Sequence, residues 1–320
     1  MPSLSTPARQ MVEVDAVPPL RSHTVALSSA QAETLREILQ GQGFKFEPRP
    51  YTIYFAQKPG LTVAVYEKGP KAVVQGKDTQ SFIEFTLEPE VLGEARFGYE
   101  ELHHPERFAP HFGIDESGKG DFFGPLVIAG VYTDATIARD LLEAGIRDSK
   151  SIGSDAQIRK LADIVRATPG LVSETIVVSP EKYNPLYEKI GNLNRLLAWG
   201  HARVIENLCT AKPGCPSALS DQFANPQVLE RALMEKGKQI ELRQQTKAES
   251  DYAVAAASIL AREKFIDWLA SAEKQWGIKF PKGASGAVLE AARTLIQQHG
   301  PDALRGTAKL HFKTAQQAMS

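Results

Sequence analysis

The stretch His111–Tyr132 constrains the fold of this chain more than any other part of the sequence. A short apolar strand ends there in two adjacent carboxylates, Asp115 and Glu116, and a Gly-Lys-Gly turn leads into a mostly apolar strand, Leu126–Tyr132. The pattern predicts a hairpin within a sheet that is covered on both faces. Because acids at the end of a buried strand are costly without a positive partner, we expect a divalent cation such as Mg²⁺ beside them.

The same stretch has two other interpretations. Acidic residues beside glycines are also common in solvated turns, so a purely structural turn stays an alternative. Gly113, Gly118 and Lys119 have the spacing of a phosphate-binding loop. That loop is disfavoured because Gly120 stands where a Ser or Thr is required, because two acids occupy the loop, and because no helix follows it.

The composition sets broad limits on the kind of protein. A chain of 320 residues is long enough for two domains, and its net charge of −1 argues neither for nor against a nucleic-acid partner. The two cysteines, Cys209 and Cys215, are too few for a disulfide framework, which is typical of a reducing compartment. The sequence contains no membrane-spanning apolar run and no signal-peptide core, so we expect a cytoplasmic protein without membrane contact.

Changes in pattern along the chain predict its domain organisation: a flexible leader at 1–22, a small N-terminal domain at 23–92, a linker at 93–110 and a catalytic domain at 111–320. The small domain is expected to be an α-β-β-β-α unit with a three-stranded antiparallel sheet. Lysines that include Lys58 and Lys77 alternate with aromatic residues there. They favour a nucleic-acid backbone as ligand, although aromatic core residues and edge-protecting lysines would give the same pattern.

The larger domain is predicted to be α/β. After the hairpin we expect a third strand near Thr133, and then helices and strands that alternate up to a long helix from about Ser250 to Trp276. The Ala253–Ala257 stretch of this helix has mostly small side chains, which would let another element approach closely. Hairpin strands followed by alternating elements predict a mixed sheet with helices on both faces. The segment 277–320 is expected to be a basic tail whose cations either contact phosphates or form a solvated surface, namely Lys279, Lys282, Arg293, Arg305, Lys309 and Lys313.

Four carboxylates are predicted to meet at one edge of this sheet: Asp115, Glu116, Asp221 and Glu249. Asp221 follows a short strand and Glu249 precedes the long helix, and strand ends and helix starts gather at such an edge. Their mutual repulsion would be relieved by two Mg²⁺ ions about 3.5–4 Å apart, an arrangement suited to phosphodiester hydrolysis. Asp221 as a turn residue and Glu249 as a helix cap are the structural alternatives, and spacing alone does not separate Glu249 from Asp251.

At this point the motifs resemble a known family, the type 2 ribonucleases H. Asp-Glu-Ser-Gly-Lys-Gly at 115–120 resembles the first-strand signature, and the blocks at 147–150 and 255–262 match further family motifs. Lys119, Lys-Ala-Glu at 247–249 and the N-terminal domain with its Gln-Gly-Lys at 75–77 make the chain more similar to ribonuclease HIII than to ribonuclease HII. The resemblance implies a ribonuclease H-like mixed sheet flanked by helices, with a TATA-binding-protein-like α+β domain before it.

The resemblance also implies an activity, namely endonucleolytic cutting of the RNA strand in RNA–DNA hybrids with Mg²⁺ or Mn²⁺. Asp115, Glu116, Asp221 and Glu249 match the catalytic positions. The substrate-binding positions are Gly118, Lys119 and Gly120, whose backbone would read the 2′-hydroxyl, together with Ser149, Lys150, Lys58 and Lys77. The sibling family uses a C-terminal tyrosine at RNA–DNA junctions, and no tyrosine follows Tyr252 here.

Two other functions remain open from the sequence, a non-catalytic nucleic-acid-binding protein and a DNA-junction nuclease with a similar acid cluster. No obligate protein partner is predicted.

Overall fold

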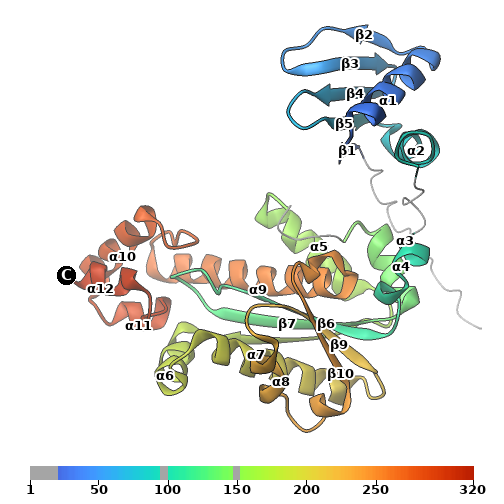
Figure 1. Ribbon diagram of the computed structural model, residues 1–320. Coiled ribbons are helices and arrows are strands. Elements are labelled where there is room, and N and C mark those ends of the chain that lie inside the picture. The colour runs from blue at the N-terminus through green and yellow to red at the C-terminus, as the bar shows by residue number, and fades with distance from the viewer. Residues whose placement is uncertain (1–20, 94–99, 147–151) are drawn as a thin grey trace, which may run out of the picture. The chain divides into compact units, whose positions relative to one another are not determined.

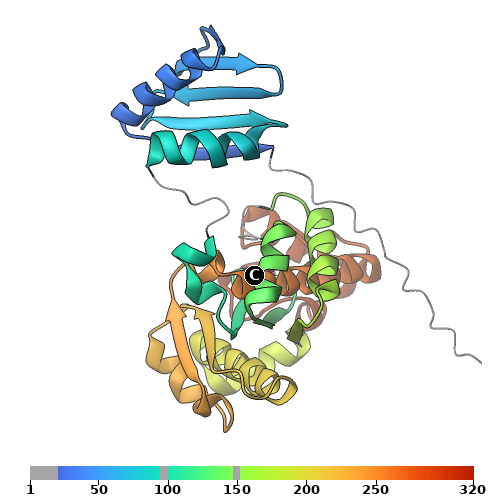
Figure 2. The ribbon, with the colours of Figure 1, turned by 90° about the vertical axis from the view of Figure 1, so that its right-hand side faces the viewer.

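The computed structural model describes residues 21–93, 100–146 and 152–320. The chain divides into two compact units, Met1–Pro105 and Glu106–Ser320, and Figures 1 and 2 show both. The predicted leader lies outside the described residues up to residue 20, and so do Ser149 and Lys150. The predicted linker at 93–110 includes the boundary between the units and two short helical segments, α3 (Glu100–His103) and η2 (Pro105–Arg107).

The first unit is a five-stranded antiparallel sheet packed against helices. The strand order is β1-β5-β4-β3-β2. The strands are β1 (Ser22–Ala26), β2 (Lys45–Glu47), β3 (Thr52–Lys58), β4 (Leu61–Tyr66) and β5 (Lys71–Gly76). The helices are α1 (Ser29–Gly41), α2 (Thr79–Phe82) and its π-helical continuation η1 (Ile83–Leu92). One apolar cluster joins α1, α2 and η1 to the inner face of the sheet.

The α+β character of this unit agrees with the prediction, but the three-stranded sheet was wrong. β1 pairs with β5 and β2 pairs with β3, which adds one strand at each edge. Both additions are short edge strands with few buried side chains, so their sequences carry little periodic signal. The cap of α1 is as expected, because Ser28 and Gln31 form a capping box.

The predicted substrate-binding residues Lys58 and Lys77 lie at the same end of this sheet, beside the β3–β4 turn. The Lys58 ammonium lies 4.5 Å from the centre of the Phe44 ring, and Lys77 packs against Gly60. The aromatic residues of this unit fall into two groups, one in the core and one exposed, where it could contact a nucleic acid. Tyr54 belongs to the core, whereas the Tyr66 side chain is exposed.

The second unit contains a mixed five-stranded sheet in the order β10-β9-β6-β7-β8. β10, β9 and β6 run parallel, and β6, β7 and β8 are antiparallel to one another in turn. The strands are β6 (His111–Ser117), β7 (Leu126–Thr133), β8 (Val172–Val178), β9 (Ser217–Asp221) and β10 (Glu241–Gln245). The hairpin and the mixed sheet are therefore confirmed. The strand expected near Thr133 is the end of β7 rather than a separate element.

Two long helices cover the opposite faces of this sheet (Figure 1), α7 (Leu193–Ala211) and α9 (Tyr252–Trp276). On the α9 side, a Cβ at Gly113 of β6 would lie 2.3 Å from the main chain of Ala253 and Val254. The smooth start of α9 thus allows the close approach that the sequence predicted. On the other side, Gly130 of β7 leaves room for side chains of α7. The central hairpin is therefore enclosed from both faces.

Shorter helices complete this unit: α4 (Ala135–Glu143), α5 (Asp155–Ala167), α6 (Pro180–Ile190), α8 (Pro226–Ala232), η4 (Gly237–Gln239), η5 (Ala248–Ser250), α10 (Gly286–His299), α11 (Ala303–Thr307) and α12 (Lys313–Met319). Sequence reasoning missed α6, which contains two prolines. Pro180 is tolerated because it occupies the first turn, where no intrahelical N–H bond is made.

The predicted basic tail is folded onto the unit as α10, α11 and α12. Lys309 is fully buried, so its expected contact with phosphates was wrong. Lys282 forms an ion pair with Asp155 at 2.8 Å. Over the described ranges, none of the helices is long and apolar enough to cross a membrane.

Candidate active site

Three of the predicted acids meet where neighbouring parallel strands end. Asp115 and Glu116 lie near the end of β6, and Asp221 is the final residue of β9. The register pairs Ile114 with Ser220, so the next residues along the two strands, Asp115 and Asp221, are neighbours. Parallel pairing thus builds the acid cluster from segments about a hundred residues apart in sequence.

Asp115 lies in an environment that opposes its negative charge. The residue is 9% exposed, and burial together with the charges of Glu116 and Asp221 raises its pKa to about 7. A hydrogen bond with Ser258 of α9 and the Glu116 amide, which donates to Asp115 Oδ1 at 2.8 Å, only partly offset this effect. The negative charge of ionised Asp115 is therefore not balanced by the protein, and a cation beside it would stabilise it.

Glu116 has the partners that Asp115 lacks. Burial alone would raise its pKa, but the hydrogen bond and charge of His201 and the charge of Lys119 outweigh burial and lower the pKa. His201 Nε2 lies 3.1 Å from Glu116 Oε2, and its Nδ1 lies 3.0 Å from Ser220 Oγ. Lys119 Nζ lies 3.4 Å from Glu116 Oε1. Glu116 is therefore held as an oriented carboxylate.

Sequence reasoning missed His201. The side chain is fully buried in α7, on the same stripe as Leu197, Val204 and Leu208. A histidine within an otherwise apolar helical stripe was the available signal, because a buried imidazole needs hydrogen-bonding partners.

The fourth predicted acid, Glu249, lies in η5, the short turn that connects β10 to α9. The amide of the preceding residue, Ala248, donates to Asp221 Oδ1 at 3.1 Å and so attaches this turn to the end of β9. The turn starts at Lys247, whose φ of 59° is left-handed and unusual for a side chain of this type. Backbone strain of this kind is often retained at functional sites.

Asp251 is the alternative to Glu249 as the fourth acid, and its carboxylate makes structural contacts. Its Oδ1 accepts from the amides of Ala253 and Val254 and thereby caps α9. The same atom lies 3.0 Å from Nε2 of His111, a buried residue whose Nδ1 lies 2.7 Å from the Ala109 carbonyl oxygen. Both ring nitrogens of His111 face acceptors, so a doubly protonated ring satisfies them best. This pair ties the start of β6 to the start of α9.

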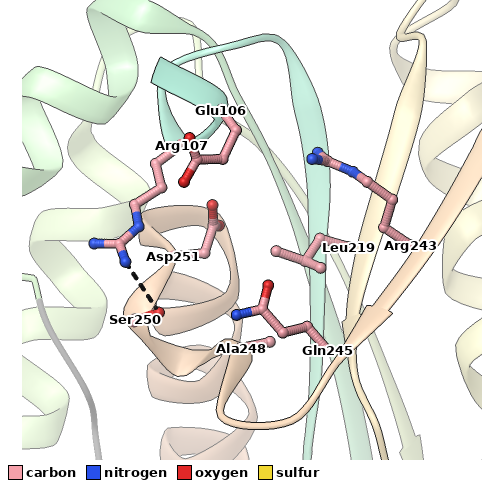
Figure 3. A pocket seen from close by; sticks show the side chains of 8 residues that line it. All are labelled: Glu106, Arg107, Leu219, Arg243, Gln245, Ala248, Ser250 and Asp251. Atoms are coloured by element: carbon pink, nitrogen blue, oxygen red, sulfur yellow. Dashed lines mark hydrogen bonds between the residues drawn. The ribbon is translucent and has the colours of Figure 1, made fainter. Parts of the chain in front are cut away.

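A cavity of about 50 Å³ lies beside the η5 turn (Figure 3). Arg107 Nη2 donates to Ser250 Oγ at 3.4 Å across its rim. Arg243 extends towards it from β10, and among the described residues its buried Nε has no hydrogen-bond partner. The remaining lining residues are Glu106, Leu219, Gln245, Ala248 and Asp251. A polar cavity of this size fits ordered water rather than a substrate group.

The predicted Gly118-Lys119-Gly120 turn follows β6 directly and so adjoins the acids. Gly118 has a φ of +89°, and a Cβ there would lie 2.2 Å from the Pro125 carbonyl oxygen. Only glycine fits this position. Nothing lies within 4 Å of a Cβ at Gly120, so the main chain of the turn is open on that side.

The donor set fits hard divalent cations. Its predicted members are all carboxylates, which Mg²⁺ and Mn²⁺ prefer, and the raised pKa of Asp115 reflects charge that a cation would compensate. Among the described residues, no group of three or more His, Cys, Asp or Glu side chains is already arranged to hold a metal ion. Like charges repel, so carboxylates are expected to draw together only around bound cations.

Comparisons with known proteins agree with this geometry. The family model described as ribonuclease HII matches residues 112–315. Ribonuclease HIII of Protochlamydia amoebophila is 46% identical over 283 residues, which are 88% of this chain and 92% of the relative. Ribonuclease HIII of Chlamydia abortus is 44% identical over 290 residues, or 90% and 94% of the two chains. The chain belongs to the ribonuclease HIII family.

Solved structures support the same assignment. Bst-RNase HIII in complex with Mn²⁺ matches with a TM-score of 0.65 and 25% identity, covering 93% of this chain and 98% of that one. Aquifex aeolicus RNase H3 matches with a TM-score of 0.53 and 28% identity, covering 90% and 99%. The protein is therefore a ribonuclease H, a hydrolase with an α/β fold, and its family implies dependence on a divalent metal ion.

Proposed function

We propose that this protein cuts the RNA strand of RNA–DNA hybrids at the edge formed by β6, β9 and η5. The observation that carries the proposal is the meeting of Asp115, Glu116 and Asp221 beside an open glycine turn. Family membership supports the same activity. The acids would hold two divalent ions, Mg²⁺ or Mn²⁺, which when bound supply an activated water and charge stabilisation at the leaving oxygen.

Each residue of the site then has a defined task. Asp115 and Asp221 would supply oxygen ligands from neighbouring strand ends, and His201 would keep Glu116 oriented as a third. Glu249 is the better candidate for the fourth ligand, because the Asp251 carboxylate is committed to His111 and to the cap of α9.

Substrate selection would depend on the glycine turn and on surfaces beyond it. The main chain of Gly118-Lys119-Gly120 would contact the 2′-hydroxyl, the group that distinguishes RNA from DNA. Ser149 and Lys150 are proposed as further substrate-binding residues on the strength of the family resemblance. The first unit would hold the hybrid through residues that include Lys58 and Lys77, since cations positioned beside the phosphate backbone strengthen binding without reading sequence.

Cleavage of three substrates side by side tests the proposal: an RNA–DNA hybrid, a DNA duplex with one ribonucleotide, and plain DNA. With Mg²⁺ or Mn²⁺ we expect rapid cutting of the hybrid and none of plain DNA. Asp115→Asn should abolish cutting yet still retard the hybrid in a gel, whereas Asp163→Asn, at a residue whose side chain is 77% exposed, should cut normally.

The outcomes separate the alternatives. Retardation of the hybrid without cleavage by the parent protein would favour a non-catalytic binding protein, and cutting of branched all-DNA substrates would favour a junction nuclease. Normal cutting by Asp115→Asn would contradict the assignment of the site.

Deletion of residues 1–90 tests the role of the first unit. We expect a higher KM for the hybrid and a nearly unchanged kcat, because the acids and the glycine turn all belong to the second unit. An unchanged KM would contradict the role in binding. The cytoplasmic location and the lack of an obligate protein partner stay predictions.

A further inference from the structure

Lys309 is a fully buried lysine that the proposed chemistry does not use. It lies between α11 and α12, and its Nζ donates to the carbonyl oxygens of Asp121 at 2.9 Å and Gly124 at 2.7 Å. Burying an ammonium group is costly, so a lysine in such a place needs partners that only this position offers. Both of its acceptors belong to the segment 121–124, which follows the glycine turn directly.

The C-terminal part of the chain holds the segment 121–124 at several further points. Lys309 N donates to the Phe122 carbonyl oxygen at 2.8 Å, and Gly124 N donates to the Thr307 carbonyl oxygen at 2.9 Å. Gly283 N donates to Asp121 Oδ1 at 2.6 Å, and Phe122 N donates to the Gly283 carbonyl oxygen at 2.9 Å. The segment is therefore fastened to two loops that lie more than 150 residues later in sequence.

This fastening has a consequence for the turn Gly118–Gly120. The turn begins at the end of β6, whose hydrogen bonds to β7 extend to Ser117, and it ends at Asp121, whose amide donates back to the Gly118 carbonyl oxygen at 3.3 Å. In the part of the chain that the structure describes, the main chain of Lys119 and Gly120 makes no hydrogen bond of this kind, and Gly120 has open space beside it. The position of the turn relative to the acids thus depends on what holds Asp121.

We propose that Lys309 is a positioning residue, which holds the main chain of the Gly118–Gly120 turn at the distance from the acid cluster that ribose recognition requires. The inference rests on the proposed function of the turn and deepens it, since it makes the C-terminal segment a determinant of selectivity for RNA. The segment itself is anchored by Asn184 of α6, whose Nδ2 donates to the Ala308 carbonyl oxygen at 3.0 Å and whose Oδ1 accepts from Leu310 N at 2.9 Å.

The bonds to both carbonyls do not require a charge on Lys309. Burial lowers the pKa of Lys309 to about 7, and the charge of Asp121 only partly opposes this effect. A neutral amine still has two N–H donors, which are enough for the two carbonyl oxygens. The positioning role is therefore expected to persist across neutral pH.

The test replaces Lys309 by Met, whose unbranched side chain is one atom shorter and has no hydrogen-bond donor. We expect kcat on an RNA–DNA hybrid to fall about tenfold to a hundredfold with little change in KM, because a small displacement of a positioning group acts on the chemical step. The matched control is Lys238→Met, a change at an exposed lysine in η4, which precedes the start of β10 and so lies away from the strand ends that carry the acids; it should leave both constants unchanged.

A second readout separates positioning from general destabilisation. The ratio of kcat/KM between an RNA strand with 2′-hydroxyls and one with 2′-fluoro sugars should narrow at least tenfold in Lys309→Met, whereas partial unfolding would lower both values equally. Hydrogen exchange of the amides of 118–124 should accelerate, while that of the β6 and β7 amides stays as in the parent. An unchanged ratio together with unchanged exchange in a folded variant would overturn the inference.

Asn184→Ala provides a milder version of the test if Lys309→Met does not fold. It leaves the Lys309 amine in place but releases the segment 308–310, so we expect the same changes in exchange and selectivity at a smaller size; wild-type values would overturn the inference. If the parent protein cuts no hybrid, the proposed function fails by itself. The exchange of residues 118–124 in the variants still decides whether Lys309 holds the turn.

Discussion

Replacing Asp115 by Asn should stabilise the metal-free protein while it removes the activity. The Asp115 carboxyl is buried beside Glu116 and Asp221, and its pKa is raised from 3.8 to about 7. A carboxyl with a raised pKa in the folded state costs no stability below pH 4, and the cost grows as pH rises to about 7. The full difference corresponds to about 4 kcal/mol. Because relaxation of the surroundings and water penetration reduce the cost of a buried charge, we expect about half of that, roughly 2 kcal/mol at pH 8.

Thermal unfolding with a chelator present measures this effect. At pH 8 the Tm of Asp115→Asn should exceed that of the parent by about 4–8 °C, and the difference should shrink towards zero near pH 4. Asp163→Asn is the matched control, because its carboxyl is exposed and its loss should change the Tm little at either pH.

At pH 8, excess Mn²⁺ should raise the Tm of the parent protein above that of Asp115→Asn. Binding to the folded state would raise the Tm of the parent by mass action, and the variant would lack one of the proposed ligands. A variant that is less stable than the parent at pH 8 without metal would refute the argument that Asp115 is retained at an electrostatic cost. So would a difference that is the same at pH 4 and pH 8.

Two further substitutions test the structural argument around the site. Gly118→Ala should lower stability by about 1–3 kcal/mol in thermal unfolding and reduce hybrid cleavage, because its Cβ would overlap the Pro125 carbonyl; Gly286→Ala, where a Cβ meets open space, is the control. Arg166→Met should cost about 1.5–3 kcal/mol in urea unfolding, since it removes a charged hydrogen bond from the buried carboxylate of Glu263, whereas Arg159→Met, which breaks a half-exposed ion pair, should cost under about 1 kcal/mol.

The central hairpin was predictable because its signals are local. Strand length, apolar composition and the position of the acids all lie within His111–Tyr132, and β6 and β7 occupy the predicted places. The cap of α1 and the start of α9 were predictable for the same reason, since a capping residue acts within its own first turn. The meeting of Asp115 with Asp221 followed from a general rule about the ends of parallel strands.

The remaining features depend on contacts between distant segments. β1 and β2 are recognisable only through the strands that they pair with, β5 and β3. Lysine side chains usually lie at the protein surface, and nothing near Lys309 in sequence reveals that its acceptors lie at Asp121 and Gly124. A pattern of residue types predicts a surface on average, whereas a single buried lysine is decided by its tertiary partners.

The two adjacent acids of β6 show how one strand end can give neighbouring carboxylates different properties. Asp115 and Glu116 are adjacent at the end of β6, and their carboxylates contact different helices. Glu116 meets His201 from α7 and Lys119 from the turn, so its charge is compensated by the protein. Asp115 faces α9, where Ser258 supplies a hydrogen bond but no charge. An environment that separates the pKa values of two neighbouring groups commonly assigns them different roles. By this reasoning a bound cation would interact most strongly with Asp115 and Asp221, and Glu116 would contribute as a ligand whose orientation the protein has already fixed.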